Sequence, residues 1–91
     1  VTYTEGVRYV AQQANAYWLL DSVAAHQLEP KLANEPFQVW KLEVTGSKAT
    51  LTVEDGNGGI LLKQEIEYTD FPEPGVTLWC VDKTIMVPSE Y

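Results

Sequence analysis

The sequence predicts an α+β fold in which one N-terminal amphipathic helix packs on a five-stranded, mostly antiparallel meander sheet. Two observations carry this prediction. Apolar residues recur at helical spacing from Thr4 to about Gln27, and from Phe37 onward they alternate with polar residues at a period of two. Sequential strands joined by short turns tend to pair with their neighbours, and a single helix can bury its apolar stripe only against the sheet.

The composition fits one small ordered domain over residues 1–91. Hydrophobic residues make up 45% of the chain and aromatic residues 11%, so a short chain gains large buried areas that offset its ordering entropy. A chain of 91 residues can build one core but not two. It begins at Val1 rather than Met, so we expect an upstream N-terminal segment to be missing.

Charge and hydropathy argue against several classes of partner. Six basic against thirteen acidic residues give a net charge of −7, which opposes binding to nucleic acid and to anionic membranes. No apolar run approaches the roughly 18 residues of a membrane span, and no signal-peptide pattern is present. Cys80 is the only cysteine, so no internal disulfide can form. We therefore expect a cytoplasmic protein without a cofactor or metal.

The expected helix carries a carboxylate on its apolar face. Thr4 suits the N-cap, Pro30 ends the pattern, and residues 29–36 are expected to form a loop. At 100° per residue, Asp21 falls near the middle of the apolar stripe. The full stripe consists of Val7, Val10, Ala11, Ala14, Tyr17, Trp18, Asp21, Ala25 and Leu28.

Five short strands are expected after the loop. The first two flank a turn at Gly46-Ser47, a turn cluster at residues 55–59 precedes the third, and a longer connection at residues 71–75 follows it. The last two strands are apolar on both faces, so they should lie under the helix on one side and under something else on the other. The expected strands are Phe37 to Val44, Ala49 to Glu54, Ile60 to Tyr68, Val76 to Val81 and Thr84 to Val87.

Two interpretations of Asp21 remain open. As a structural group it would accept a hydrogen bond from a buried indole or phenol, of which Trp40, Tyr68 and Tyr17 are the candidates. As a functional group it would be a desolvated carboxylate with a raised pKa, in a pocket with Trp18, Trp40 and Tyr68. The structural interpretation is favoured because buried polar groups are nearly always paired.

Two further motifs could indicate a functional site, and each has a simpler structural explanation. Residues 55–60 resemble the middle of a calcium loop, but that register puts Val53 and Gln64 where acidic ligands are needed, so a hairpin turn is expected. Cys80, His26 and Asp21 could be the parts of a nucleophilic triad. Their spacing does not support one, and a cysteine among apolar neighbours is usually inert.

Acidic residues on the exposed sheet face could imitate a nucleic-acid backbone. Lysines project from the same face, and mixed signs are typical of an ordinary solvated face with cross-strand pairs. The acidic residues are Glu43, Glu54, Glu65 and Glu67, and the lysines are Lys41, Lys48 and Lys63.

The chain has more apolar side chains than one small core can hide. These residues are Leu19, Leu20 and Val23, which fall outside the helical stripe, and Trp79, on a strand that is apolar on both faces. They are the candidate interface residues, and they predict a homo-oligomer or a protein partner.

Six stretches together resemble a family of small bacterial proteins of unknown function that is associated with plasmids, integrative elements and phages. The resemblance spans nearly the whole chain, and it implies that members begin further upstream with an aromatic and histidine-rich segment. It implies no activity. The stretches are YTEGVRY at 3–9, AYWLLD at 16–21, FQVWKL at 37–42, EDGNG at 54–58, QEIEYTDFP at 64–72 and PSEY at 88–91.

Three functions remain open at this stage. The first is a non-enzymatic protein-interaction module, an accessory protein of a mobile element or phage. The second is a small-molecule-binding domain or enzyme remnant that uses Asp21 in an aromatic pocket. The third is an acidic inhibitor that competes with nucleic acid.

Overall fold

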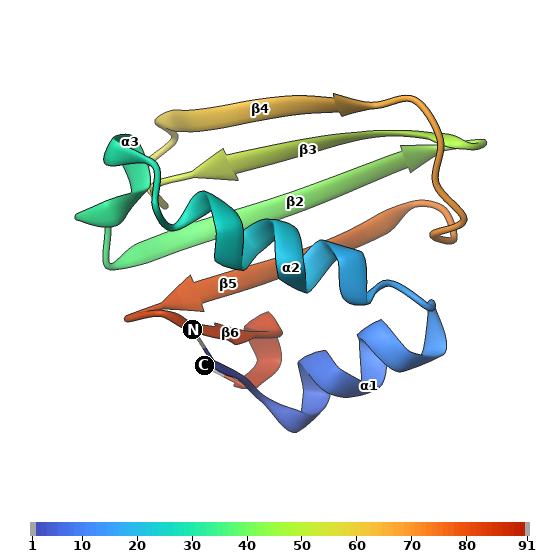
Figure 1. The fold of residues 1–91 in the computed structure, drawn as a ribbon, viewed down its shortest axis with the longest axis horizontal. Coiled ribbons are helices and arrows are strands. Elements are labelled where there is room, and N and C mark those ends of the chain that lie inside the picture. Colours follow the sequence, from blue (N-terminus) through green and yellow to red (C-terminus); the bar gives the residue numbers. More distant parts are fainter. Residues whose placement is uncertain (1, 91) are drawn as a thin grey trace.

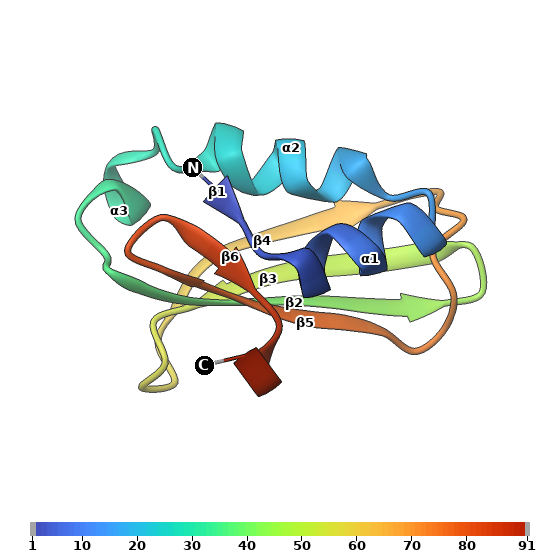
Figure 2. The ribbon, with the colours of Figure 1, turned by 90° about the horizontal axis from the view of Figure 1, so that it is seen from below.

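The computed structural model describes residues 2–90, with Lys31 described by its backbone alone. Two helices, α1 (Glu5–Gln13) and α2 (Tyr17–His26), lie on one face of a six-stranded mixed sheet (Figure 1 and Figure 2). The fold is therefore α+β as expected, although with two main helices instead of one. The strands are β1 (Thr2–Tyr3), β2 (Phe37–Thr45), β3 (Lys48–Glu54), β4 (Ile60–Ile66), β5 (Gly75–Val81) and β6 (Thr84–Met86).

The strand order, β1-β6-β5-β2-β3-β4, differs from the expected meander. β2, β3 and β4 follow one another as antiparallel neighbours, but β5 returns to pair with β2, and β1 pairs with β6 in parallel. β2 to β5 thus form a Greek key. The reason lies in the side chains: β4 exposes Lys63, Gln64 and Glu65 and suits an edge, whereas the apolar β5 needs a neighbour on each side.

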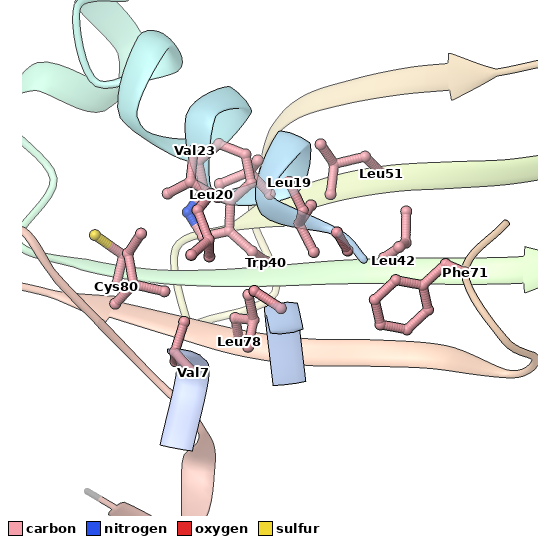
Figure 3. Close-up of a cluster of buried hydrophobic side chains, with 14 of the residues drawn as sticks. Val7, Leu19, Leu20, Val23, Trp40, Leu42, Leu51, Phe71, Leu78 and Cys80 are labelled. Carbon is pink, nitrogen blue, oxygen red and sulfur yellow. The ribbon is translucent and has the colours of Figure 1, made fainter. Parts of the chain in front are cut away.

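The connection from β4 to β5 crosses one end of the sheet. Backbone hydrogen bonds fix it there, from Thr69 N to Ser47 O at 2.7 Å and from Val44 N to Pro74 O at 2.9 Å. This course inserts Phe71, which is 6% exposed, into the core between the helices and the sheet (Figure 3). The expected long connection at this place is confirmed, and its aromatic residue closes one end of the core.

The expected single helix is broken at Asn15, which has a φ of +52°. The N–H of Ala16 donates to the carbonyl of Ala11 at 2.8 Å, and the N–H of Asn15 donates to the carbonyl of Gln12 at 3.4 Å. These two bonds are the Schellman ending of a helix, which needs a left-handed residue and accepts Asn. α2 therefore starts again with its own rotational phase, and the stripe calculated across the break is wrong beyond residue 14.

The core lies between the helices and one face of the sheet. Figure 3 shows Leu19, Leu20 and Val23 of α2 among side chains from β2, β3 and β5. Alternation along the strands supplies the other half, because every second residue of β2 and β3 points toward the helices. The most deeply buried residues from the sheet are Trp40, Leu42, Leu51, Val53, Leu78, Cys80 and Ile85.

The segment expected as a loop at 29–36 contains a one-turn helix, α3 (Pro30–Ala33). Pro30 occupies its first turn, where a missing N–H costs nothing. Leu32 on this turn is 1% exposed, so the segment closes the end of the core opposite to Phe71. None of the helices within residues 2–90 is long and apolar enough to cross a membrane.

A C-terminal turn, η1 (Pro88–Glu90), fastens the start of α1. The Thr4 hydroxyl donates to Glu90 Oε1 at 2.5 Å, and the N–H of Gly6 donates to Glu90 Oε2 at 3.3 Å. The Thr4 side chain also caps α1 by accepting from the N–H of Val7. These bonds, the one from Thr4 first, lower the pKa of Glu90 below the ordinary glutamate range.

Candidate functional site

Asp21 is exposed, so the buried polar cluster expected around it does not exist. The break at Asn15 rotates α2, and Leu20 rather than Asp21 points into the core. Tyr17 and Trp18, on the same expected stripe, are 43% and 37% exposed. A carboxylate in water on a helix surface is neither desolvated nor in need of a buried donor, so neither interpretation of Asp21 applies.

The buried polar cluster of this protein is built from two glutamines. Gln27 and Gln38 exchange amide hydrogen bonds of 2.9 and 3.0 Å, and Trp40 Nε1 donates to Gln38 Oε1 at 2.9 Å. Gln38 also donates to the carbonyls of Leu32 and Glu35. The Trp40 indole thus has the partner that Asp21 was expected to provide. Every polar atom of the cluster is satisfied, so it joins α2, α3 and β2 and offers nothing to a ligand.

Two of the four expected pocket residues do come together. Trp18 and Tyr68 line a groove of about 330 Å³ beside β4, together with Ile66 and Asp70. The Tyr68 hydroxyl donates to Asp70 Oδ1 at 2.7 Å, and this bond, more than the charge of Asp70, raises the pKa of Tyr68. Trp40 and Asp21 do not line this groove. Trp40 is buried in the core, and Asp21 is an exposed residue of α2.

The expected interface residues separate into two groups. Leu19, Leu20 and Val23 are 3%, 6% and 0% exposed, so they form the core and cannot form an interface. The prediction was wrong because it rested on the phase of an unbroken helix. Trp79 is different: it is half-buried and lies on the sheet face opposite to the helices.

We call that face of the sheet the open face, since α1 and α2 lie on the other side (Figure 2). The strand pairings place Trp79 of β5 between Val39 of β2 and Met86 of β6, and Phe37 opposite Val81. The rings of Phe37 and Trp79 are tilted at 60° with their centroids 5.2 Å apart. These half-buried residues form the open-face patch, which consists of Phe37, Val39, Trp79, Val81 and Met86.

The β3–β4 loop borders this patch. Gly56, at a φ of +85°, packs so closely on Phe37 that a Cβ would lie 2.9 Å from its ring. Asp55 Oδ1 accepts from the N–H groups of Asn57 and Gly59 at 2.8 and 3.0 Å, so its carboxylate stabilises the turn. The hairpin interpretation of 55–60 is therefore confirmed. Among residues 2–90, no three metal-ligating side chains gather into a site.

The rest of the open face is polar and carries both signs of charge. Lys41 Nζ lies 3.0 Å from Glu54 Oε2 across β2 and β3, and Thr50 donates to Glu65 Oε2 at 3.2 Å. Carboxylates held in such cross-strand pairs do not present the uniform row of negative charge that a nucleic-acid mimic needs. The open face therefore has an apolar half on β2, β5 and β6 and a charged half toward β4.

The triad of Cys80, His26 and Asp21 is not assembled. Cys80 is 1% exposed, and burial raises the pKa of its thiol. His26 Nδ1 donates to the carbonyl of Ser22 at 2.8 Å, and its ring packs on Trp40 with centroids 6.0 Å apart. A thiol that stays protonated in the core is a small apolar group and not a nucleophile.

A second groove, also of about 330 Å³, lies between α1 and the segment 71–76. Its lining is mostly apolar and includes Tyr9, which is 63% exposed. Tyr9, Val10 and Pro72 supply no charged group that could orient a small ligand.

The comparison with known proteins adds one finding. A model described as a family of unknown function (DUF6876) matches residues 1–91. The chain belongs to this family. No curated protein and no solved structure matches the chain, so neither supplies a ligand or an activity.

Sequence reasoning found Trp79 but missed the other members of the open-face patch. The signal was present, because the last two strands are apolar at successive positions and only one face can lie under a helix. What the sequence could not show is that β2 lies beside β5, which brings Phe37 and Val39 next to Trp79.

Proposed function

We propose that this protein is a non-enzymatic interaction module that binds another protein through the open-face patch. The observation that carries the proposal is the Phe37–Trp79 ring pair, which stands with Val39, Val81 and Met86, all half-buried, on the sheet face that α1 and α2 do not cover. Tryptophan, phenylalanine and methionine are enriched in protein interfaces, and a central tryptophan is a frequent source of binding energy.

The shape of the surface supports a protein partner over a small ligand. The patch is spread over three neighbouring strands, and the two grooves of about 330 Å³ are lined by other residues. A small molecule needs a concave site that surrounds it, whereas a flat apolar surface with a polar surround fits another protein.

Charge indicates the character of the partner. The chain carries a net charge of −7, and the open face beside the patch carries carboxylates from β2, β3 and β4. Complementary charges steer association and raise its rate. We therefore expect a partner with an apolar centre and a basic rim, whose binding weakens as salt increases.

The test is site-specific photo-crosslinking. A photoreactive phenylalanine analogue replaces Met86, at the side of the patch next to Trp79, and in a matched variant it replaces the exposed Tyr9 of α1. We expect position 86 to crosslink a defined protein from a bacterial lysate and position 9 not to do so. Excess unlabelled parent protein should compete, and Trp79→Ser should compete poorly.

The outcomes separate the alternatives. Crosslinking from position 9 alone would move the site to the groove beside α1. Equal competition by the parent and by Trp79→Ser would remove the patch from the interface. Retention of the native fold by Trp79→Ser, checked by circular dichroism, is the control that gives a failure to compete its meaning.

The setting belongs to the same proposal. The resemblance to small plasmid, integrative-element and phage proteins supports an accessory role in a mobile element. The lone Cys80 supports a reducing cytoplasm.

A further inference from the structure

We propose that two copies of this chain pair edge to edge through β4, antiparallel, with Gln64 of each copy at the two-fold axis. β4 is the last strand of the sheet, and within residues 2–90 no strand pairs with its outer edge. An edge strand of seven residues presents a row of backbone donors and acceptors that another strand can satisfy.

The two faces of β4 restrict the register. Leu62, Gln64 and Ile66 pair with buried residues of β3 and therefore lie on the helix side, while Lys63 and Glu65 lie on the open face. In an antiparallel ladder, paired residues lie on the same face, so the two-fold axis must pass through a residue and not between two.

Charge then selects one register. An axis through Lys63 would place lysine opposite lysine, and an axis through Glu65 would place glutamate opposite glutamate. An axis through Gln64 places Lys63 opposite Glu65 of the partner subunit, and this pair occurs twice. Opposite charges directly across a ladder stabilise it and like charges destabilise it.

The two side chains are available for this pairing. Lys63 is exposed and makes no ion pair with any described residue. Glu65 is exposed, and the bond from Thr50 to its Oε2 holds it on the open face while leaving Oε1 for a second donor. A lysine in the middle of an edge strand discourages pairing with an arbitrary strand. In the proposed dimer, Glu65 of the partner subunit neutralises the charge of Lys63.

Packing on the helix side points to the same register. Figure 1 shows that α2 lies over the middle of the sheet and leaves β4 beside it. Leu62 and Ile66 are consequently only half-buried. With Gln64 at the axis, Leu62 lies opposite Ile66 of the partner subunit, so both apolar side chains gain a neighbour on the part of the helix side that α2 leaves uncovered.

The first test is a charge swap read by sedimentation equilibrium. We expect the parent to form a concentration-dependent dimer, and Lys63→Glu or Glu65→Lys to raise its dissociation constant about tenfold or more. The double variant Lys63→Glu/Glu65→Lys restores both pairs with reversed polarity, so it should regain dimer. Arg8→Glu, on α1 away from β4, makes the same change in net charge as Lys63→Glu and should leave the dimer intact.

A cysteine crosslink tests the register itself. Gln64→Cys places two thiols on directly opposite residues about 4.5 to 5.5 Å apart at Cα, which a disulfide can bridge. In Lys63→Cys the two positions are offset by two residues and lie about 8 Å apart, beyond disulfide reach. We expect a covalent dimer on oxidation of the first variant only. The native Cys80 is 1% exposed and does not interfere.

Several results would overturn the proposal. They are a parent that stays monomeric up to about 1 mM, single swaps that dimerise like the parent, a double swap that does not recover, and a dimer that Gln64→Cys fails to crosslink. The proposal does not depend on the open-face patch, and Trp79→Ser should dimerise normally. A failure of one proposal therefore leaves the other standing.

Discussion

The apolar side chains on the two faces of the sheet are buried to very different extents. On the helix side, Trp40, Leu51 and Leu78 are 1%, 1% and 2% exposed. On the open face, Val39, Trp79 and Met86 are only half-buried. Strand alternation places apolar residues on both faces, but one pair of helices can cover only one.

The comparison separates the apolar residues that the fold buries completely from those that it leaves partly exposed. A side chain under the helices contributes burial and packing to the fold. A side chain on the open face contributes less, because water still reaches it. The proposed function rests on these half-buried side chains, Phe37, Trp79 and Met86.

The largest difference is expected between Leu51→Ala on the helix side and Met86→Ala on the open face. Leu51→Ala removes a core side chain that is 1% exposed and leaves a cavity, so it should cost about 2 to 5 kcal/mol. Met86→Ala should cost less than about 1 kcal/mol. Urea denaturation measures both. Equal losses would show that the open face is covered in the free protein.

The covering layer depends on the buried glutamines, so Gln38→Leu should also be costly. This change keeps the volume but takes away the acceptor of the Trp40 indole N–H and the donor to Gln27 Oε1 and to the Glu35 carbonyl. We expect a loss of about 2 to 4 kcal/mol. The matched control is Asp21→Ala, which should stay within about 0.5 kcal/mol of the parent because Asp21 is exposed. A larger loss from Asp21→Ala would restore the structural role that the helix stripe first suggested.

The phase of α2 depends on Asn15, and a smaller effect is expected there. Alanine at a φ of +52° is strained, so Asn15→Ala should destabilise the protein by about 1 kcal/mol. Asn15→Gly should be tolerated, because glycine accepts positive φ. Thermal melts of the two variants provide the measurement. If both melt like the parent, the Schellman ending does not hold the two helices in place.

The smallest effect concerns Glu90, which fastens the start of α1, and it depends on pH. The hydrogen bond from Thr4 lowers the pKa of Glu90, so the stability it provides is complete above the ordinary glutamate pKa. It is lost as the pH falls through the lowered value. Glu90→Gln should therefore melt below the parent at neutral pH, and the two should converge only once the pH has fallen below the lowered pKa of Glu90. A constant difference at all pH values would contradict the assignment.

Local patterns predicted the strands because their causes are local. Alternation from Phe37 onward, the turn at Gly46-Ser47 and the turn chemistry of Asp55 depend on neighbouring residues, and the observed β2, β3, β4, β5 and β6 lie where these patterns put them. The long connection before Gly75 was recognised for the same reason.

The helix break at Asn15 was also a local event, but its signal is weak. One asparagine between two alanines can continue a helix or end it in the left-handed region, and neither choice is written in the periodicity. That one residue decides which face of α2 is apolar. It buries Leu19, Leu20 and Val23 and exposes Asp21, and so it reverses the expected interface and the expected site.

The sequence by itself determined the fold class, the strands and the turns, because each follows from side chains within a few residues of one another. Only the tertiary structure decided that β5 lies beside β2, that Gln38 and Gln27 satisfy each other, and that Phe37 meets Trp79. These contacts join residues far apart in the chain. Their free energy comes from packing whole layers together, which no local pattern records.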